Sequence, residues 1–236
     1  MTDKPLADRI ALVTGASRGI GAATARALGA AGAHVILTAR TAGGLEEVEE
    51  AIYASGGSAT IAPMDLTENE SVSRLAAAVA ERWQALDLLV LNAASLGSLS
   101  AIPAIDFKEF AKVLTLNVTA QAAMLAAFDP LLKAAKQARV LGITSSVGQT
   151  PRAYWGSYGA SKAAFENLLL SYGEEVRHIS GVRVGIVDPG STRTKMRARA
   201  FPGENPETVK APEVVAERIV QLAVSGFETG HFERVD

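Results

Sequence analysis

The sequence contains no cysteine, and that absence excludes several kinds of chemistry at once. Disulfide bonds, thiol nucleophiles and thiolate metal sites all require cysteine. The three histidines, His34, His178 and His231, are scattered along the chain without the spacing of metal ligands. We therefore expect neither a metal centre nor cysteine-based catalysis.

Net charge is also nearly absent, because 23 Lys and Arg residues face 25 Asp and Glu residues. This balance gives no electrostatic reason to expect nucleic acid or a membrane surface as a partner. The longest uncharged stretch, residues 88–105, is broken by Asn, Ser, Gly and Pro, so we do not expect it to span a membrane. Residues 1–10 lack the apolar segment of a secretory signal. These absences favour a soluble, cytoplasmic protein.

What the sequence does have is a large apolar fraction. Hydrophobic residues make up 48% of the 236 residues, much of it alanine, while aromatic residues make up only 6%. Such a composition can fill a core, and the length suits one α/β domain. We see no repeat, linker or low-complexity tract, so we assign residues 1–236 to a single domain.

Short apolar runs alternate with helical patterns along the chain. The runs predict strands at residues 10–14, 34–40, 58–65, 87–92, 138–145 and 182–187, and a last short strand at 227–232. The first helical pattern ends near residue 32, and the later ones cover residues 44–54, 67–84, 106–130, 157–179 and 212–224. Thr67 with Glu70 predicts a capping box, Asp106 with Glu109 a capped helix start, and Pro212 a first helical turn. This alternation predicts a doubly wound, Rossmann-like parallel sheet of about seven strands with helices on both faces.

A glycine-rich turn joins the first predicted strand to the first helix. It reads Gly15-Ala16-Ser17-Arg18-Gly19-Ile20-Gly21, with the spacing G-x-x-x-G-x-G. Gly15 permits a tight exit from the strand, and Gly19 and Gly21 permit close approach of backbone and ligand. A helix N-terminus also offers free N–H groups to a pyrophosphate. An ordinary βα turn is the alternative, but the flanking strand and helix favour a dinucleotide site.

The end of the second predicted strand indicates which dinucleotide would bind. In dinucleotide folds an acidic residue here binds the ribose 2′-hydroxyl of NAD, whereas an arginine accommodates the 2′-phosphate of NADP. Ala39 occupies the acidic position, Arg40 follows it, and Arg18 could reach the same phosphate. These residues favour NADP(H) over NAD(H), unless Arg40 is only a solvated surface residue. Asp65, at the end of the third strand, could accept a hydrogen bond from the adenine amino group.

A second group of residues has the chemistry of acid–base catalysis. Tyr158 and Lys162 are four residues apart, so one helix face would carry both. A nearby ammonium group, with the positive nicotinamide ring, would lower a tyrosine pKa from its ordinary value of about 10. Ser145, at a predicted strand end, could orient a substrate carbonyl. Asn117, in an apolar helix, needs a polar partner and could hold a water near Lys162. Each residue alone would fit an ordinary surface or core position, but the combination predicts catalysis.

The order of these motifs resembles the short-chain dehydrogenase/reductase family in its compact single-domain branch, and within it a bacterial subgroup of oxidoreductases of undefined substrate. The resemblance covers nearly the whole chain and implies hydride transfer between NADP(H) and a small carbonyl or alcohol substrate. In the implied catalytic tetrad, Tyr158 is the acid/base, Ser145 orients the carbonyl, Lys162 lowers the tyrosine pKa and binds ribose, and Asn117 holds a relay water. Ser145 is preferred to Ser146 because of its S-x-x-G spacing to Gly148.

The resemblance also implies which residues bind the cofactor. They are Gly15, Ser17, Arg18, Gly19, Ile20, Gly21, Arg40, Asp65, Leu66, Asn92, Ala93, Tyr158, Lys162, Pro189, Gly190 and Thr194.

Two departures from the family pattern stand out. Ala94 replaces a glycine after the fourth predicted strand and narrows the room beside the cofactor. The usual Asp-Gly-Gly tail is missing, and this puts in doubt the oligomer contacts that the tail normally makes. The family implies a homotetramer or homodimer through the helices at 106–130 and 157–179.

The substrate is less well indicated. Tyr154 and Trp155 could line an apolar pocket or pack beneath a loop, and the basic segment 193–199 could attract an anionic substrate or be largely solvated. A 3-oxoacyl-thioester reductase is therefore an alternative function. A non-catalytic NADP-binding regulatory module is another, disfavoured by the complete tetrad. A sugar-nucleotide epimerase or dehydratase would need a larger region after Gly190.

Overall fold

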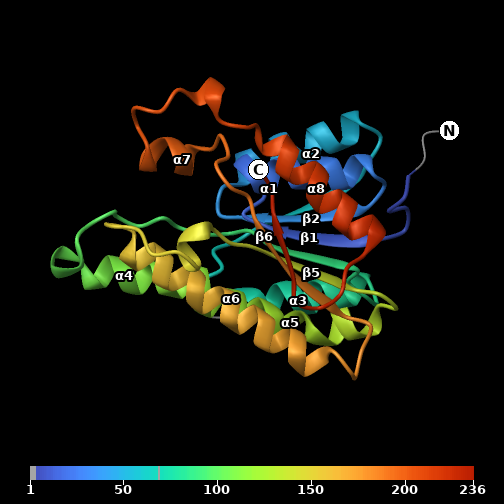
Figure 1. Ribbon diagram of the computed structural model, residues 1–236. Coiled ribbons are helices and arrows are strands. Elements are labelled where there is room, and N and C mark those ends of the chain that lie inside the picture. Colours follow the sequence, from blue (N-terminus) through green and yellow to red (C-terminus); the bar gives the residue numbers. More distant parts are fainter. Residues whose placement is uncertain (1–3, 69) are drawn as a thin grey trace.

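The computed structural model describes residues 4–68 and 70–236. Its centre is a parallel sheet of seven strands in the order β3-β2-β1-β4-β5-β6-β7, which confirms the predicted fold class (Figure 1). The strands are β1 (Ile10–Thr14), β2 (His34–Ala39), β3 (Ser58–Pro63), β4 (Leu88–Leu91), β5 (Arg139–Ile143), β6 (Arg183–Asp188) and β7 (His231–Arg234).

The helices form a layer on each face of the sheet (Figure 1). On one face lie α1 (Gly19–Ala30), α2 (Ala42–Ala54) and α8 (Pro212–Ser225); on the other lie α3 (Ser71–Arg82), α4 (Phe107–Leu114), α5 (Ala120–Ala134) and α6 (Gly156–Val176). A short helix that the sequence did not predict, α7 (Lys195–Ala200), lies beyond the carboxyl edge of the sheet.

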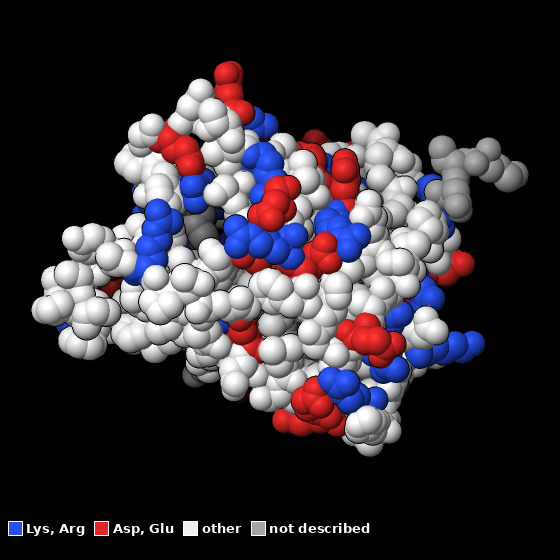
Figure 2. All heavy atoms as spheres, in the orientation of Figure 1, with Lys and Arg blue, Asp and Glu red and all other residues white. Residues whose placement is uncertain are grey.

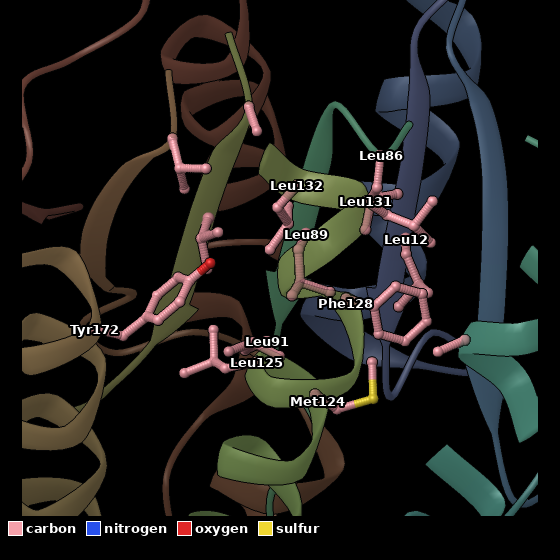
Figure 3. Close-up of a cluster of buried hydrophobic side chains, with 14 of the residues drawn as sticks. Leu12, Leu86, Leu89, Leu91, Met124, Leu125, Phe128, Leu131, Leu132 and Tyr172 are labelled. Carbon is pink, nitrogen blue, oxygen red and sulfur yellow. The ribbon is translucent and has the colours of Figure 1, made fainter. Parts of the chain in front are cut away.

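Each face of the sheet has its own hydrophobic core. On the side of α5, strand residues such as Leu12, Leu89 and Leu91 pack against Met124 and Phe128 (Figure 3). On the other side, residues of β1 and β2 pack against α1, α2 and α8. Because both faces are covered, central strands such as β1 and β4 are almost continuous apolar runs, whereas the edge strands β3 and β7 are partly exposed.

Helices α4 and α5 form one helical run, because residues Thr115–Thr119 between them make a π-helical turn. Asp106 accepts hydrogen bonds from the backbone N–H groups of Lys108 and Glu109, at 2.8 and 3.3 Å, which confirms the predicted start. The run Phe107–Ala134 is long and apolar enough to cross a membrane by length and composition alone. In the fold its buried residues, among them Met124 and Phe128, belong to the core.

Several predicted boundaries are wrong. The helix expected to end near residue 130 continues to Ala134, because buried Leu131 and Leu132 follow Pro130 into the core. The last strand covers His231–Arg234 rather than 227–232, since residues 226–230 turn through Gly226 and Gly230, whose φ angles are 74° and 93°. Both residues are glycines in the left-handed region, where other residues are strained.

The predicted capping box at Thr67 and Glu70 is also wrong. The backbone N–H and hydroxyl of Thr67 both donate to Asp65 Oδ1, at 2.9 and 2.7 Å. Glu70 has a left-handed backbone with φ of 64°, and α3 begins at Ser71 without a side-chain cap. A local bond to the carboxylate two residues earlier thus competes successfully with capping. Residue 69, inside the predicted helix, lies outside the described residues.

Candidate active site

The predicted site residues gather at the carboxyl edge of the sheet. The strand order changes direction between β1 and β4, and ligands of doubly wound sheets bind in the crevice at such a point. The segments after β4 and β6, which include α4 and α7, extend past this edge (Figure 1). The surface is hollowed between them, with Lys or Arg side chains on the rim (Figure 2).

The glycine-rich turn is packed too tightly for side chains. A Cβ added at Gly21 would lie 2.3 Å from Gly15 O and 2.5 Å from Asn92 Nδ2, and Gly15 itself has a φ of 65°. Gly19, with φ of 56°, lies close to Thr194, whose Cγ2 would be 3.3 Å from an added Cβ. Helix α1 has no side-chain cap at its N-terminus, which leaves its first N–H groups to a ligand. This geometry suits a dinucleotide pyrophosphate.

Asn92 and Ala93 hold the glycine-rich turn in place. Asn92 Nδ2 donates to Thr14 O at 2.9 Å and to Gly15 O at 3.2 Å. The backbone N–H groups of Asn92 and Ala93 donate to Thr14 Oγ1, at 2.9 and 3.0 Å. The sequence indicated Asn92 as a site residue, but it did not indicate that buried Thr14 joins the ends of β1 and β4. A direct contact of Asn92 or Ala93 with cofactor stays a prediction.

The residues predicted at the adenosine end are mostly exposed. Arg18 and Arg40 are both exposed, and Arg40 Nη1 lies 4.0 Å from Asp65 Oδ2. The pKa of Asp65 is lowered, chiefly by the hydrogen bond from the Thr67 backbone N–H and less by the Arg40 charge. A carboxylate therefore does lie near Arg40, which the sequence analysis did not anticipate, although such an exposed pair is weak. The Leu66 side chain is in the core, so only its backbone could face a ligand.

Tyr158 and Lys162 lie on the same side of α6 as predicted, and both are buried. Lys162 Nζ donates to Ile143 O, at the end of β5, at 2.8 Å, and lies 5.8 Å from the centre of the Tyr158 ring. The Tyr158 hydroxyl lies 3.9 Å from Met196 Sδ, on α7.

The protein's own groups raise the Tyr158 pKa rather than lowering it. Burial is the main cause, and the negative charge of Asp188 adds to it. Burial lowers the pKa of Lys162 to about 8, and Glu166 partly offsets that decrease. The predicted lowering of the Tyr158 pKa therefore requires a further positive charge, which the sequence analysis assigned to the nicotinamide ring.

Ser145 follows β5 and precedes a 3₁₀ turn at Ser146–Gly148. Ser145 is half-buried and Ser146 is exposed. The Ser145 carbonyl accepts the Gly148 N–H at 2.9 Å, which closes the turn. Among the residues that the structure describes, the Ser145 hydroxyl has no side-chain or backbone partner. It is thus free to contact a substrate.

Asn117 is 1% exposed and lies in the π-helical turn. Its side chain accepts the Ser95 N–H at 2.8 Å and donates to Ser95 O and Ser161 Oγ, both at 2.9 Å. The Ser161 hydroxyl in turn donates to Tyr158 O at 2.7 Å. The Asn117 side chain thus joins the segment after β4 to α6. A relay water would have to bind its main chain.

Gln121 supports the same turn, and the sequence analysis missed it. Its Nε2 donates to Leu116 O at 2.9 Å and to Ala93 O at 3.0 Å, so a buried amide bonds a carbonyl within the π-helical turn. The available signal was a second amide, four residues after Asn117, in an otherwise apolar helix.

The segment after β6 adds the third side of the site. Buried Asp188 accepts the Gly190 N–H at 3.0 Å, and Asp188 O accepts the Val235 N–H at 2.9 Å. Gly190, with φ of 57°, would place a Cβ 2.7 Å from Val235 O. Pro189 is buried, and Thr194 Oγ1 caps α7 by accepting the Arg197 N–H at 3.1 Å. The residues near the C-terminus thus support this turn.

The Trp155 ring lies beside Tyr158, and the Phe201 ring lies beside Trp155. The Trp155 ring centre is 6.1 Å from that of Tyr158 and 5.7 Å from that of Phe201. The Phe201 ring lies 5.1 Å from the Arg152 guanidinium and 3.8 Å from that of Arg197, which also pairs with Glu204. We call Trp155 and Phe201 the aromatic wall. Arg197 is therefore a packed residue, whereas the neighbouring Arg193, Lys195 and Arg199 are exposed.

A crevice at the carboxyl edge of a doubly wound sheet, with a tyrosine–lysine pair on an adjacent helix, is typical of a dinucleotide-dependent oxidoreductase. Within residues 4–68 and 70–236 no group of three acidic or histidine side chains could hold a metal. The family model described as short chain dehydrogenase matches residues 9–205. The chain therefore belongs to the short-chain dehydrogenase family and is an NAD(P)-dependent oxidoreductase.

Individual relatives agree with that assignment. The uncharacterized oxidoreductase YciK of Escherichia coli K12 is 36% identical over 210 residues, which cover 88% of this chain and 82% of YciK. A short-chain dehydrogenase structure from Pseudomonas syringae superposes with a TM-score of 0.96 at 37% identity, over 99% of this chain and 97% of the other. Another, from Escherichia coli CFT073 in complex with NADPH, has a TM-score of 0.94 at 34% identity and covers all of both chains.

Proposed function

We propose that this protein is an NADP(H)-dependent carbonyl reductase or alcohol dehydrogenase. The observation that carries the proposal is the buried Tyr158–Lys162 pair, whose lysine is bonded to Ile143 O at the end of β5, two residues before Ser145. The four catalytic residues that we assign are Asn117, Ser145, Tyr158 and Lys162.

The carboxyl edge fits NADP(H). The tight packing at Gly15 and Gly21 brings the backbone close to a pyrophosphate, and Arg18 and Arg40 would hold a 2′-phosphate. The NADPH complex of the Escherichia coli relative supports this choice. When bound, the nicotinamide would supply or accept the hydride. We assign further contacts to Ser17, Gly19, Ile20, Asp65, Leu66, Asn92, Ala93, Tyr158, Lys162, Pro189, Gly190 and Thr194.

The tyrosine would act as the acid in carbonyl reduction. Because burial and Asp188 raise its pKa, Tyr158 keeps its proton at neutral pH and can donate it as negative charge develops on the substrate oxygen. The Ser145 hydroxyl would donate a hydrogen bond to the same oxygen and orient it. The Lys162 ammonium would bind a ribose hydroxyl and stabilise the tyrosinate once it forms. Asn117 would position a proton-relay water through its main chain.

The aromatic wall suggests a substrate with an apolar body next to its carbonyl group. A second candidate is a 3-oxoacyl-thioester reductase, which the exposed cations Arg193, Lys195 and Arg199 favour because thioester carriers are anionic. The two candidates differ only in the substrate.

A panel of carbonyl compounds tests the proposal. Purified protein is mixed with NADPH and either an aromatic ketone or aldehyde, a simple sugar aldehyde, or a short 3-oxoacyl thioester, and NADPH absorbance is followed. We expect consumption with at least one member. The catalytic assignment would be contradicted if the protein bound NADPH but neither oxidised it with any carbonyl of a broad panel nor reduced NADP+ with the corresponding alcohols.

The proposed function includes an oligomeric state and a cellular location for the protein. We expect a homodimer or homotetramer that uses the helical run Phe107–Ala134 and α6, and a cytoplasmic location. Light scattering after size exclusion checks the first, since a monomer at micromolar concentration would contradict it. Fractionation of the producing cells checks the second.

A further inference from the structure

One buried acidic residue beside the catalytic pair has no part in the mechanism above. Glu166 lies on α6 one turn after Lys162 and is 8% exposed. The Thr144 hydroxyl donates to its Oε1, and Gln149 Nε2 donates to its Oε2 at 3.2 Å. Thr144 precedes Ser145 directly, and Gln149 follows the 3₁₀ turn. The carboxylate therefore holds both ends of the segment that presents the Ser145 hydroxyl.

Gly148 explains why the carboxylate can come so close. A Cβ at this position would lie 2.7 Å from Glu166 Oε1 and 3.2 Å from Lys162 C. A side chain there would push the turn away from α6. The S-x-x-G spacing therefore has a physical cause: the glycine lets the Ser145 turn rest against Glu166.

Lys162 and Glu166 attach consecutive residues of one strand end to the same helix. Lys162 Nζ bonds Ile143 O at 2.8 Å, and Glu166 bonds the next residue, Thr144. These two attachments fix the distance between Ser145 on the turn and Tyr158 on the helix. Catalytic groups must be held to within a fraction of an ångström, and a misplacement of about 1 Å can cost about 100-fold in rate.

The carboxylate also acts through its charge. A buried ammonium group is costly unless a negative group compensates it. Among the described residues, Glu166 on α6 is the acidic group that acts on Lys162, while Asp188 on β6 acts on Tyr158. Tyr158 is the other titratable group that contacts the lysine. Removal of the Glu166 charge would let Lys162 lose its proton at a lower pH.

We propose that Glu166 is a positioning residue, which holds the Ser145 turn against α6 through Thr144 and Gln149 and places a compensating carboxylate one helical turn from the buried Lys162 ammonium. The inference rests on the proposed function of Ser145 and Lys162. It assigns a second purpose to α6, which holds the turn as well as presenting the tyrosine.

Two variants separate the two effects. Glu166→Gln removes the charge but keeps an oxygen for the Thr144 hydroxyl, whereas Thr144→Val removes that hydrogen bond but keeps the charge. For carbonyl reduction, we expect Glu166→Gln to shift the alkaline limb of the pH profile down by roughly one unit. We expect Thr144→Val to lower kcat about 10- to 100-fold without moving that limb. Glu166→Asp should return the alkaline limb of the pH profile to its wild-type position but leave kcat below the wild-type value.

Glu175→Gln is the matched control, because it makes the same change at an exposed position of the same helix. Circular dichroism and melting curves restrict the comparison to folded variants. An unshifted limb in folded Glu166→Gln would overturn the charge effect, and wild-type kcat in folded Thr144→Val would overturn the positioning effect.

NADPH binding provides a readout that needs no substrate. If Lys162 binds ribose, NADPH affinity should weaken above the lysine pKa, and Glu166→Gln should move that pH downward while Glu175→Gln leaves it unchanged. Failure of the wild type to reduce any carbonyl would defeat the proposed function alone. An identical pH dependence of NADPH affinity in the wild type and Glu166→Gln would defeat the charge effect of Glu166, whatever the reaction.

Discussion

The cofactor side and the substrate side of the carboxyl edge are built differently. On the cofactor side, Thr14 and Asn92 join β1 to β4 through hydrogen bonds directed at backbone groups. On the substrate side, the segments before α6 and after β6 meet through the Trp155–Phe201 ring pair and the Arg152 guanidinium beside Phe201. Backbone-directed bonds in a tight turn tolerate few replacements, whereas partly exposed stacking can change at small cost. Under the proposed function, the fold itself would hold the cofactor and replaceable side chains would hold the substrate.

The largest effect should come from the catalytic tyrosine, which lies where the two sides meet. Tyr158→Phe keeps the ring but removes the proton donor, so kcat should fall by about 10²- to 10⁴-fold. NADPH affinity, measured by nicotinamide fluorescence, should change little. Turnover close to that of the wild type would show that another group supplies the proton.

The next effect should come from the glycine-rich turn. Gly21→Ala places a Cβ 2.3 Å from Gly15 O, so the turn must move. Such overpacking costs about 1–3 kcal/mol, and NADPH binding should weaken by at least about tenfold. Gly203→Ala is the control, since an added Cβ there meets nothing within 4 Å. Equal melting temperatures and NADPH affinities for the two variants would refute the tight packing.

An effect that is confined to one dinucleotide is expected at Arg40. Charge-assisted hydrogen bonds contribute about 1.5–3 kcal/mol, so Arg40→Ala should weaken NADPH binding about 10- to 100-fold. NADH binding should hardly change, because NADH lacks the 2′-phosphate. Arg26→Ala, which removes a partly exposed arginine of α1 that pairs with Glu213, is the control. Equal losses for both dinucleotides would argue against a phosphate contact.

The smallest effect should come from the aromatic wall. Phe201→Ala removes a ring pair of about 0.5–1.5 kcal/mol, so KM for an apolar carbonyl substrate should rise about two- to tenfold. NADPH affinity and melting temperature should stay near wild-type values. A large loss of NADPH binding would mean that the two sides are not independent.

The sequence predicted the parts of the fold that depend on local spacing. The central strands are apolar runs, the glycines occupy a turn that excludes side chains, and Tyr158 and Lys162 share a helix face because helical geometry requires it. The family resemblance added the positions of Ser145 and Asn117.

The sequence could not predict contacts between distant segments. Asn117 bonds Ser95 and Ser161, which are 22 and 44 residues away, and no local pattern pairs these positions. Helix α7 is too short to show a periodic pattern and depends on Thr194 as its cap. The capping box failed for the opposite reason, because Thr67 found a partner only two residues away.

The π-helical turn at Thr115–Thr119 gives the helix around Asn117 one more residue per turn than its neighbours. Removal of a single residue from this turn would let an unbroken α-helix form. The π-helical turn accommodates its extra residue by rotating less per residue than an α-helix, in which each residue turns by about 100°, so the segments on either side would keep nearly the same faces while the residues inside the turn were displaced. Asn117 would lose its place opposite Ser95 and Ser161. In this helix the number of residues therefore sets a tertiary contact, and a deletion that made the helix more regular would break the hydrogen bonds that join it to Ser95 and to α6.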